Sequence, residues 1–301
     1  MKHLLSIESM AVADIEHILD RARALKSERG HPGAAAGSLA GQAWALIFTK
    51  PSTRTRVSFE VGIRELGGQV LFLNAADIQL GRGEPIKDTA RVLSRMIHGA
   101  VIRTFAQQDV EEFARYSGIP TVNALTDDEH PCQILTDIFT FQEKRGPIQG
   151  KVVAFIGDGA CNVPVSWIFA ASKLGFEFRI AAPKSFQPDT ALLKRAGGRI
   201  TVTESPAEAA AGADLLYTDV WVSMGKEEES AARIKQLTGY QINQALLRLA
   251  KPDALVLHCL PAYRGKEIDE ITFEQHAQSI FDQAENRLHV QKSILTWLVA
   301  A

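Results

Sequence analysis

The chain has 301 residues, of which 46% are hydrophobic and 23% charged, and this length favours two domains over one. Its formal net charge of −2 excludes the basic excess that favours nucleic-acid binding, so an anionic ligand must meet a local cluster of cations. No run of residues approaches the roughly 18 apolar positions of a membrane span, which excludes an integral membrane protein.

Strand and helix patterns alternate through the first half of the chain. Residues 11–25 form an amphipathic pattern, and residues 30–41 are rich in glycine, alanine and proline, so a helix and then a loop are expected. Helices are also expected from near 53, 87 and 110 and from 131 to about 144. The predicted strands are Ala43–Phe48, Gln69–Leu73, Ala100–Phe105 and Pro120–Val122. This alternation is typical of a parallel sheet.

A second alternating series follows a break at Pro147–Gly150, which we interpret as a hinge. Its predicted strands are Val152–Ile156, Phe178–Ala181, Ile200–Val202, Leu215–Thr218 and Ala254–Leu257, and a last helix is expected over Ala284–Val299. We predict an α/β protein of two domains, each a parallel β-sheet flanked by helices, with the C-terminal helix packing back on the first domain. The first domain is expected to span 1–146 plus 284–301, and the second 147–283.

The stretch 51–56, Pro-Ser-Thr-Arg-Thr-Arg, lies between the first predicted strand and a helix. Ser52 or Thr53 can cap that helix, whose first turn offers unpaired N–H groups and a positive dipole end. Two hydroxyl residues and two arginines join these groups, so the turn is a candidate phosphate site. It lacks the Gly-x-x-x-x-Gly-Lys frame of a Walker loop. The alternative is a capped surface helix with solvated arginines.

Polar residues also follow other predicted strands, where parallel sheets gather their ligands. Gln79 lies between glycines and charged residues in the loop 77–84, which is either a ligand-binding loop or a surface turn. Arg103 stands among apolar residues and requires an anionic partner, which a ligand or a structural ion pair could supply. His130 and Gln133 flank Pro131 at a helix start, where His130 could polarise a carbonyl or serve merely as a turn residue.

The turn 157–162, Gly-Asp-Gly-Ala-Cys-Asn, invites a dinucleotide-binding interpretation. The interpretation is poor, because Asn162 replaces the third glycine and the next strand ends without an acidic partner for a ribose. Asn162 suits a small carboxylate or amide group instead. Asp219 follows a later strand and could hold an ammonium group, while the acidic run Glu227–Glu229 is expected to be a solvated face.

The three cysteines are Cys132, Cys161 and Cys259, and they lie far apart in the sequence. Cys259, in the stretch His258-Cys259-Leu260-Pro261, could be a thiolate nucleophile, a hydrogen-bond partner or an inert buried thiol. No Cys-x-x-Cys pair exists, so no zinc site is predicted. An odd and sparse cysteine set indicates a reducing compartment, and residues 1–26 resemble no targeting peptide, so a cytoplasmic protein is expected.

Taken together, these motifs resemble the ornithine carbamoyltransferase family. The matching stretches occur in family order and cover almost the whole chain, and together they are highly specific. They are Ser52-Thr-Arg-Thr-Arg-Val-Ser-Phe-Glu60, Gln79-Leu-Gly-Arg-Gly-Glu-Pro85, His130-Pro-Cys-Gln133, Asp219-Val-Trp-Val-Ser-Met-Gly225 and His258-Cys-Leu-Pro261. The chain departs from the family at Cys161, where a second asparagine is usual.

The resemblance implies a homotrimer, or a multiple of trimers, that transfers the carbamoyl group of carbamoyl phosphate to the side-chain amine of L-ornithine. It implies carbamoyl phosphate binding by Ser52, Thr53, Arg54, Thr55, Gln79, Arg103, His130, Gln133, Cys259, Leu260 and Arg287. It implies L-ornithine binding by Asn162, Asp219, Ser223 and Met224. Arg103, His130, Asp219 and Cys259 would be the catalytic residues, and Gln79 would reach a neighbouring subunit's site.

The expected reaction needs no metal or organic cofactor, because phosphate is already an activated leaving group. Arg103, His130 and Thr55 would stabilise the carbonyl oxygen as it gains charge, and Asp219 and Cys259 would lie near the attacking amine. Three alternatives remain: a carbamoyltransferase for putrescine or N-acetylornithine, a nucleotide-dependent oxidoreductase, and a non-catalytic ligand-binding relative. The Ser-Met-Gly stretch at 223–225 favours ornithine over the other amines.

Overall fold

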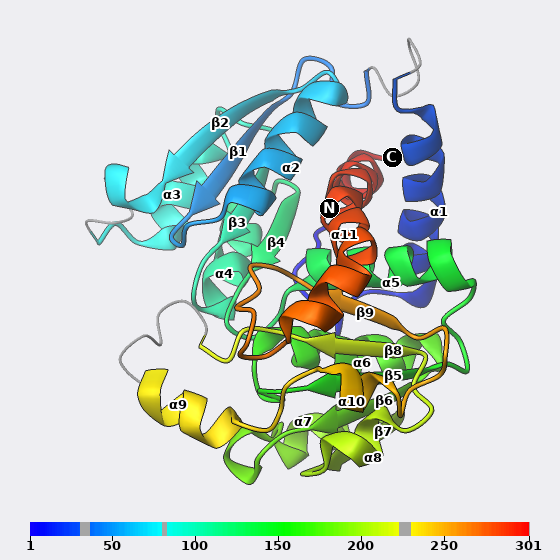
Figure 1. Ribbon diagram of the computed structural model, residues 1–301. Helices are drawn as coiled ribbons and strands as arrows, with labels where there is room; N and C mark the ends of the chain where they lie inside the picture. Colours follow the sequence, from blue (N-terminus) through cyan, green and yellow to red (C-terminus); the bar gives the residue numbers. More distant parts are fainter. Residues whose placement is uncertain (31–36, 80–82, 223–229, 301) are drawn as a thin grey trace. The chain divides into compact units, whose positions relative to one another are not determined.

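The computed structural model describes residues 1–30, 37–79, 83–222 and 230–300 (Figure 1). It divides into two compact units. The first contains Met1–Phe139 together with the chain from Glu285 onward, and the second contains Thr140–Ala284. The described residues contain no helix that is both long enough and apolar enough to cross a membrane.

The first unit contains a four-stranded parallel sheet in the order β2-β1-β3-β4 (Figure 1). The apolar runs that form β1, β3 and β4 are almost entirely buried, whereas the edge strand β2 is partly exposed, with Leu71 48% exposed. The prediction of a strand over 100–105 was too long: β3 ends at Arg103, and Phe105 lies beyond it with 48% of its surface exposed. The strands are β1 (Ala43–Phe48), β2 (Gln69–Asn74), β3 (Gly99–Arg103) and β4 (Thr121–Leu125).

Helices alternate with these strands, as the periodicity predicted. Ile47 and Ile102 point from one face of the sheet into a core shared with Val110 and Phe113 of α4. The helices of this unit are α1 (Val12–Glu28), α2 (Thr53–Glu65), α3 (Ile86–Leu93), α4 (Gln107–Ser117) and the first part of α5 (Pro131–Arg145), with a short 3-10 turn η1 at Ala75–Asp77.

The C-terminal helix α11 runs over Glu270–Val299, so it begins well before the predicted start at Ala284. Phe273, in the first turns of this helix, is buried in the apolar core of the second unit. This packing explains why the helix starts earlier than predicted. The part after Glu285 lies between α2 and α1 (Figure 1), where Ser293 Oγ donates to the Ile18 carbonyl at 2.7 Å. A Cβ at Gly62 would lie 3.1 Å from Lys292 Cγ, so glycine allows this close packing on α2. The prediction that this helix packs back on the first domain is confirmed.

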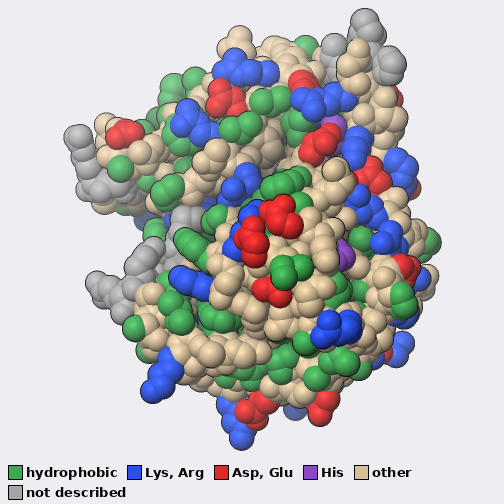
Figure 2. All heavy atoms as spheres, viewed as in Figure 1, with side chains coloured by type: hydrophobic (Ala, Val, Ile, Leu, Met, Phe, Trp, Pro, Cys, Tyr) green, Lys and Arg blue, Asp and Glu red, His purple; other side chains and the backbone are tan. Residues whose placement is uncertain are grey.

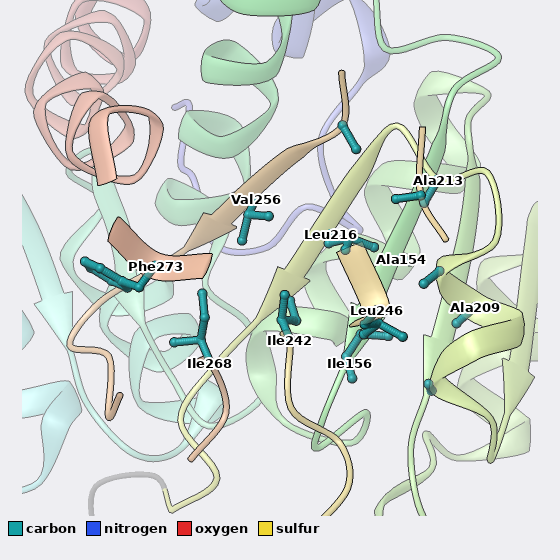
Figure 3. Packing of buried hydrophobic residues seen from close by; sticks show 14 of the residues in the cluster. Ala154, Ile156, Ala209, Ala213, Leu216, Ile242, Leu246, Val256, Ile268 and Phe273 are labelled. Atoms are coloured by element: carbon teal, nitrogen blue, oxygen red, sulfur yellow. The ribbon is translucent and has the colours of Figure 1, made fainter. Parts of the chain in front are cut away.

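The second unit contains a five-stranded parallel sheet in the order β7-β6-β5-β8-β9. Side chains of β5, β8 and β9 meet side chains of α8, α10 and the start of α11 in one apolar cluster (Figure 3). The strands are β5 (Val152–Ile156), β6 (Glu177–Ala181), β7 (Arg199–Thr203), β8 (Leu215–Thr218) and β9 (Leu255–His258). The helices are α6 (Asn162–Leu174), α7 (Thr190–Ala196), α8 (Pro206–Ala210), α9 (Ser230–Leu237) and α10 (Gln244–Leu247), with a 3-10 turn η3 at Lys184–Phe186.

Charged side chains of both signs are interspersed with apolar ones over the face of the molecule shown in Figure 2. This mixture agrees with the formal net charge of −2. Among the described side chains on this face, no broad field of a single sign is present to attract a polyanion, so recognition of an anion depends on a local arrangement of cations.

Candidate active site

The turn between β1 and α2 brings hydroxyl and cationic groups to the carboxyl end of the first sheet. Of the two predicted candidates, Ser52 is the N-cap of α2, and its Oγ accepts a hydrogen bond from the Thr55 N–H at 3.3 Å. Thr53 is exposed, Arg54 is half-buried and Thr55 is buried. This helix start has the free N–H groups and dipole that favour an anion, although anion binding itself remains a prediction.

Arg287 of α11 joins this turn to α5. Its guanidinium donates to Thr55 Oγ1 at 3.1 Å and to Gln133 Oε1 at 2.7 Å, and its side chain is buried. The Gln133 amide in turn donates to Asp137 Oδ1 at 2.9 Å. The planar fork of arginine can hold two acceptors at once, so Arg287 fixes the orientation of Thr55 and Gln133. Thr55, Gln133 and Arg287, which are far apart in the sequence and were all predicted to bind carbamoyl phosphate, therefore lie together.

Arg103 and His130 are two further buried polar residues of this region, with 4% and 5% of their surfaces exposed. The pairing of β3 with β4 shifts register between Ile102 and Arg103, an irregularity of the kind that re-aims side chains at the end of a sheet. Burial lowers the pKa of His130 well below its usual value, and the positive charges of Arg287 and Arg103 lower it further. The imidazole is therefore neutral at pH 7 and can donate a hydrogen bond to a carbonyl oxygen without losing a proton.

Gln79 lies at the surface next to residues 80–82, which are outside the described residues. In the described part of the chain, no hydrogen bond joins its side chain to the turn at Ser52–Thr55. Its backbone carbonyl accepts the Glu84 N–H at 3.2 Å, so the two ends of this loop are close together. Gln79 is thus an exposed residue at one end of this loop, and its role in a neighbouring subunit stays a prediction.

In the second unit, Asp219 and Cys259 follow the adjacent strands β8 and β9 and contact one another. The Cys259 thiol donates to Asp219 Oδ1 at 2.9 Å, and the Val220 N–H donates to the same oxygen at 2.7 Å. Burial raises the pKa of Asp219, while His258 and these two hydrogen bonds oppose the rise. Because the thiol is a hydrogen-bond donor here, the arrangement favours the hydrogen-bond role among the alternatives left open for Cys259.

Behind this pair, His258 is buried and hydrogen-bonded through both ring nitrogens. Nδ1 accepts the Leu260 N–H at 2.8 Å, so Nε2 carries the proton and donates to Glu267 Oε1 at 3.2 Å. Leu260 has a φ of 60°, a left-handed conformation that strains a residue with a large side chain. The His258–Glu267 pair holds Leu260 in this conformation and so shapes the backbone that follows β9.

The donor atoms of Asp219, His258 and Cys259 lie within 4.8 Å of one another, which raises the question of a metal ion. A histidine ligand must offer a nitrogen lone pair. In His258 the lone pair of Nδ1 is taken by the Leu260 N–H and Nε2 is bonded to Glu267. The hydrogen bonds account for these side chains without a metal.

Two comparisons of the sequence decide the family. Residues 2–143 match the family description "Aspartate/ornithine carbamoyltransferase, carbamoyl-P binding domain", and residues 149–298 match the corresponding "Asp/Orn binding domain". The chain is 54% identical to the ornithine carbamoyltransferase of Akkermansia muciniphila, over 100% of this chain and 99% of that protein. The chain belongs to the aspartate/ornithine carbamoyltransferase family.

Solved structures of this family have the same fold. The anabolic ornithine carbamoyltransferase of Campylobacter jejuni superposes with a TM-score of 0.92 at 42% identity, covering 99% of both chains. The ornithine carbamoyltransferase of Pyrococcus furiosus gives 0.91 at 43% identity, covering 98% of this chain and 96% of that one. The family and fold predicted from the motifs are confirmed, and a nucleotide-dependent oxidoreductase is not favoured.

In this carbamoyltransferase, the residues predicted for ornithine are only partly described. Asn162 is half-buried and is the first residue of α6, after a turn in which a Cβ at Gly159 would lie 2.6 Å from the Ile180 side chain. That glycine therefore lets the turn approach β6 closely. Ser223 and Met224, like the acidic run 227–229, lie outside the described residues.

Glu267 and Arg233 are among the buried charged residues near these motifs that the sequence did not point to. Glu267 accepts hydrogen bonds from His258 and from the Tyr263 N–H at 2.5 Å. Arg233 of α9 pairs with Asp158 and donates to the Trp221 carbonyl at 3.0 Å. Both residues occur in polar segments where a charged residue is normally solvated, so the sequence carried no local signal of their burial.

Proposed function

We propose that this chain transfers the carbamoyl group of carbamoyl phosphate to the side-chain amine of L-ornithine, giving L-citrulline and phosphate in arginine metabolism. One observation carries the proposal: Arg287 bridges Thr55 and Gln133 in the region that also holds buried Arg103 and a neutral His130. Such a set offers cations for a phosphate and neutral donors and acceptors for an uncharged amide. The relatives described above support the choice of reaction.

In this proposal, the first unit binds carbamoyl phosphate. Ser52, Thr53, Arg54 and Thr55 take the phosphate through hydroxyl, N–H and guanidinium groups, and Arg103 adds a second guanidinium. Thr55, Arg103 and His130 donate to the carbonyl oxygen, which gains negative charge in the transition state. Gln133, held by Arg287, orients the carbamoyl NH2 group. The backbone carbonyls of Cys259 and Leu260 are predicted to accept hydrogen bonds from the same NH2 group.

The second unit is proposed to bind L-ornithine. Asn162, Asp219, Ser223 and Met224 would hold the amino-acid end, and Asp219 and Cys259 would lie near the side-chain amine. The nucleophile must be a neutral amine, although a free alkylammonium has a pKa of about 10.4. A positively charged phosphate site and exclusion of water both favour loss of that proton. The reaction needs no cofactor, because the amine attacks the carbonyl carbon directly and phosphate is already an activated leaving group.

The decisive experiment is to measure L-citrulline after adding carbamoyl phosphate and L-ornithine to the purified full-length chain. Parallel reactions with putrescine and N-acetylornithine test the alternative acceptors. We expect carbamoylation of ornithine at a kcat/KM far above that of the other amines. Preference for another amine would replace the acceptor, and no turnover of any amine would leave a ligand-binding relative as the better description.

We further propose a homotrimer, or a multiple of trimers, in which Gln79 completes the site of a neighbouring subunit. Its exposed position on a loop supports this assignment. Two inactive variants, Gln79→Ala and Arg54→Ala, should regain activity when their subunits are exchanged, because some sites then receive both intact residues. Verified exchange without any recovery of citrulline formation would contradict sharing of the site.

The proposal also assigns one substrate to each domain and a cellular location to the protein. We assign carbamoyl phosphate to residues 1–146 with 284–301 and ornithine to residues 147–283, an assignment supported by the descriptions of the two family domains. A cytoplasmic location is supported by the sparse cysteines, which are all free thiols in the structure.

A further inference from the structure

The first unit contains a cavity of about 650 Å³ that includes none of the residues assigned to carbamoyl phosphate. It is bounded by η1, the segment just before and at the start of α3, the ends of β1 and β3, and α4. Its volume falls within the range of small-molecule sites, which is about 300–1,000 Å³. The cavity therefore has room for a ligand of its own.

Carboxylates dominate the charge of this cavity. Among the described residues that line it, Glu84, Asp109 and Glu112 are acidic and Lys87 is the one cation. The buried hydroxyl of Thr89 donates to Glu84 Oε2 at 2.6 Å, and the buried hydroxyl of Thr104 donates to Asp109 Oδ2 at 2.8 Å. These hydrogen bonds fix the positions of the Glu84 and Asp109 carboxylates in the cavity.

The remainder of the lining is largely apolar. Ile47, Ile102 and Phe113 contribute buried side chains from the strands and α4, whereas Phe105 is 48% exposed. The Lys50 ammonium, which is paired with Asp127, already lies 4.0 Å from the centre of the Phe105 ring. The buried apolar floor is therefore the part of the lining that favours a ligand with a hydrophobic body. The carboxylates disfavour an anion such as carbamoyl phosphate and also the carboxylate end of ornithine, because like charges repel.

We propose that this cavity binds a small organic cation with an apolar body, such as an aromatic amidinium, whose charge meets the carboxylates and whose body covers the apolar floor. A planar amidinium matches a carboxylate with two parallel hydrogen bonds. The site adjoins the proposed phosphate site through the backbone, since Thr49 lines the cavity and donates its N–H to the Arg103 carbonyl at 2.9 Å. The binding of the cation itself does not rest on the proposed function.

The test uses benzamidinium as the probe and benzamide as its neutral isostere, each titrated calorimetrically into the full-length chain. We expect benzamidinium to bind at least about tenfold more tightly than benzamide, because only the cation makes charge-assisted hydrogen bonds. Equal affinities, or no binding of benzamidinium at millimolar concentration, would overturn the proposal.

Three variants place the probe in this cavity. Asp109→Asn combined with Glu112→Gln should weaken benzamidinium binding at least about tenfold, while Glu111→Gln, an exposed neighbour that does not line the cavity, should not change it. Ala76→Leu should block binding by filling space without removing a charge. The thermal midpoint of each variant reports whether it folds. Unchanged affinity in both the double variant and Ala76→Leu would show that the cation binds elsewhere.

Discussion

The candidate sites of the two units differ in charge and in how they are held. In the first unit, Arg287 links Thr55 and Gln133 by two hydrogen bonds, and the charged side chains assigned to the ligand are cations. In the second unit, Asp219 carries the charge and Cys259 donates to it, with the His258–Glu267 pair behind. Each region has the charge opposite to the group that it is proposed to bind, a phosphate in one and an ammonium in the other.

The two regions also differ in how their polar side chains are fixed. In the first unit the Arg287 guanidinium fixes the neutral side chains of Thr55 and Gln133, whereas in the second unit burial raises the pKa of the Asp219 carboxyl group. A cationic partner beside Asp219 would offset the cost of burying its charge. Substitutions in the two regions should therefore affect different substrates.

The largest effect is expected for Arg54→Ala, which should abolish binding of carbamoyl phosphate while the fold remains intact. The guanidinium lies at the start of α2 and is half-buried, so its loss removes a fork that bonds a phosphate. Calorimetry with a non-reactive phosphonate mimic measures the affinity. Arg56→Ala is the matched control, since Arg56 is exposed on the same helix; unchanged affinity in Arg54→Ala would remove this turn from the site.

A smaller effect is expected for Arg287→Lys, which keeps the charge but cannot hold Thr55 and Gln133 at once. We expect kcat/KM for carbamoyl phosphate to fall by roughly 10–100-fold, because the two partners lose their fixed orientation. Steady-state kinetics measure the change, with Arg64→Lys on the exposed surface of α2 as the control. Wild-type kinetics in Arg287→Lys would mean that the bridge is purely structural.

Asp219→Asn tests whether the second unit binds ornithine without affecting the phosphate site of the first unit. Loss of the carboxylate should weaken binding of an ornithine analogue by about tenfold, because a charge-assisted hydrogen bond is lost, while affinity for the phosphonate mimic stays the same. Asp253→Asn, at an exposed position of the same unit, is the control. If both affinities changed equally, Asp219 would not distinguish the two substrates.

The smallest effect concerns pH. Burial and the neighbouring guanidinium groups lower the pKa of His130 in the folded chain, so the unfolded chain binds more protons below its own pKa of about 6.5. Stability is thus present at pH 7 and is lost as pH falls through 6.5, by at most about 1.4 kcal/mol per pH unit for one histidine. The thermal midpoint should fall less between pH 7 and 5.5 in His130→Asn than in the wild type; an identical slope would contradict a neutral His130.

Much of the architecture could be predicted because it depends on local pattern. The strands β1, β5 and β8 coincide with apolar runs in the sequence. Both faces of such a strand are buried in a parallel sheet, so nearly every residue is apolar and the run is easy to recognise. Ser52 could be assigned as an N-cap because capping involves only the next few residues. The start of α11 was missed, because Phe273 is held in the helix by packing against residues far away in sequence.

By itself, the sequence determined the α/β class, the family and the residue types that carry the chemistry, since motifs and periodicity are properties of neighbouring residues. Only the tertiary structure decided which of those residues meet. Arg287 lies 232 positions from Thr55 and contacts it through α11, and Glu267 is buried against His258 within a segment that reads as polar. Burial, proton affinity and hydrogen-bond partners depend on what surrounds a side chain in space, and that is fixed only when the whole chain has folded.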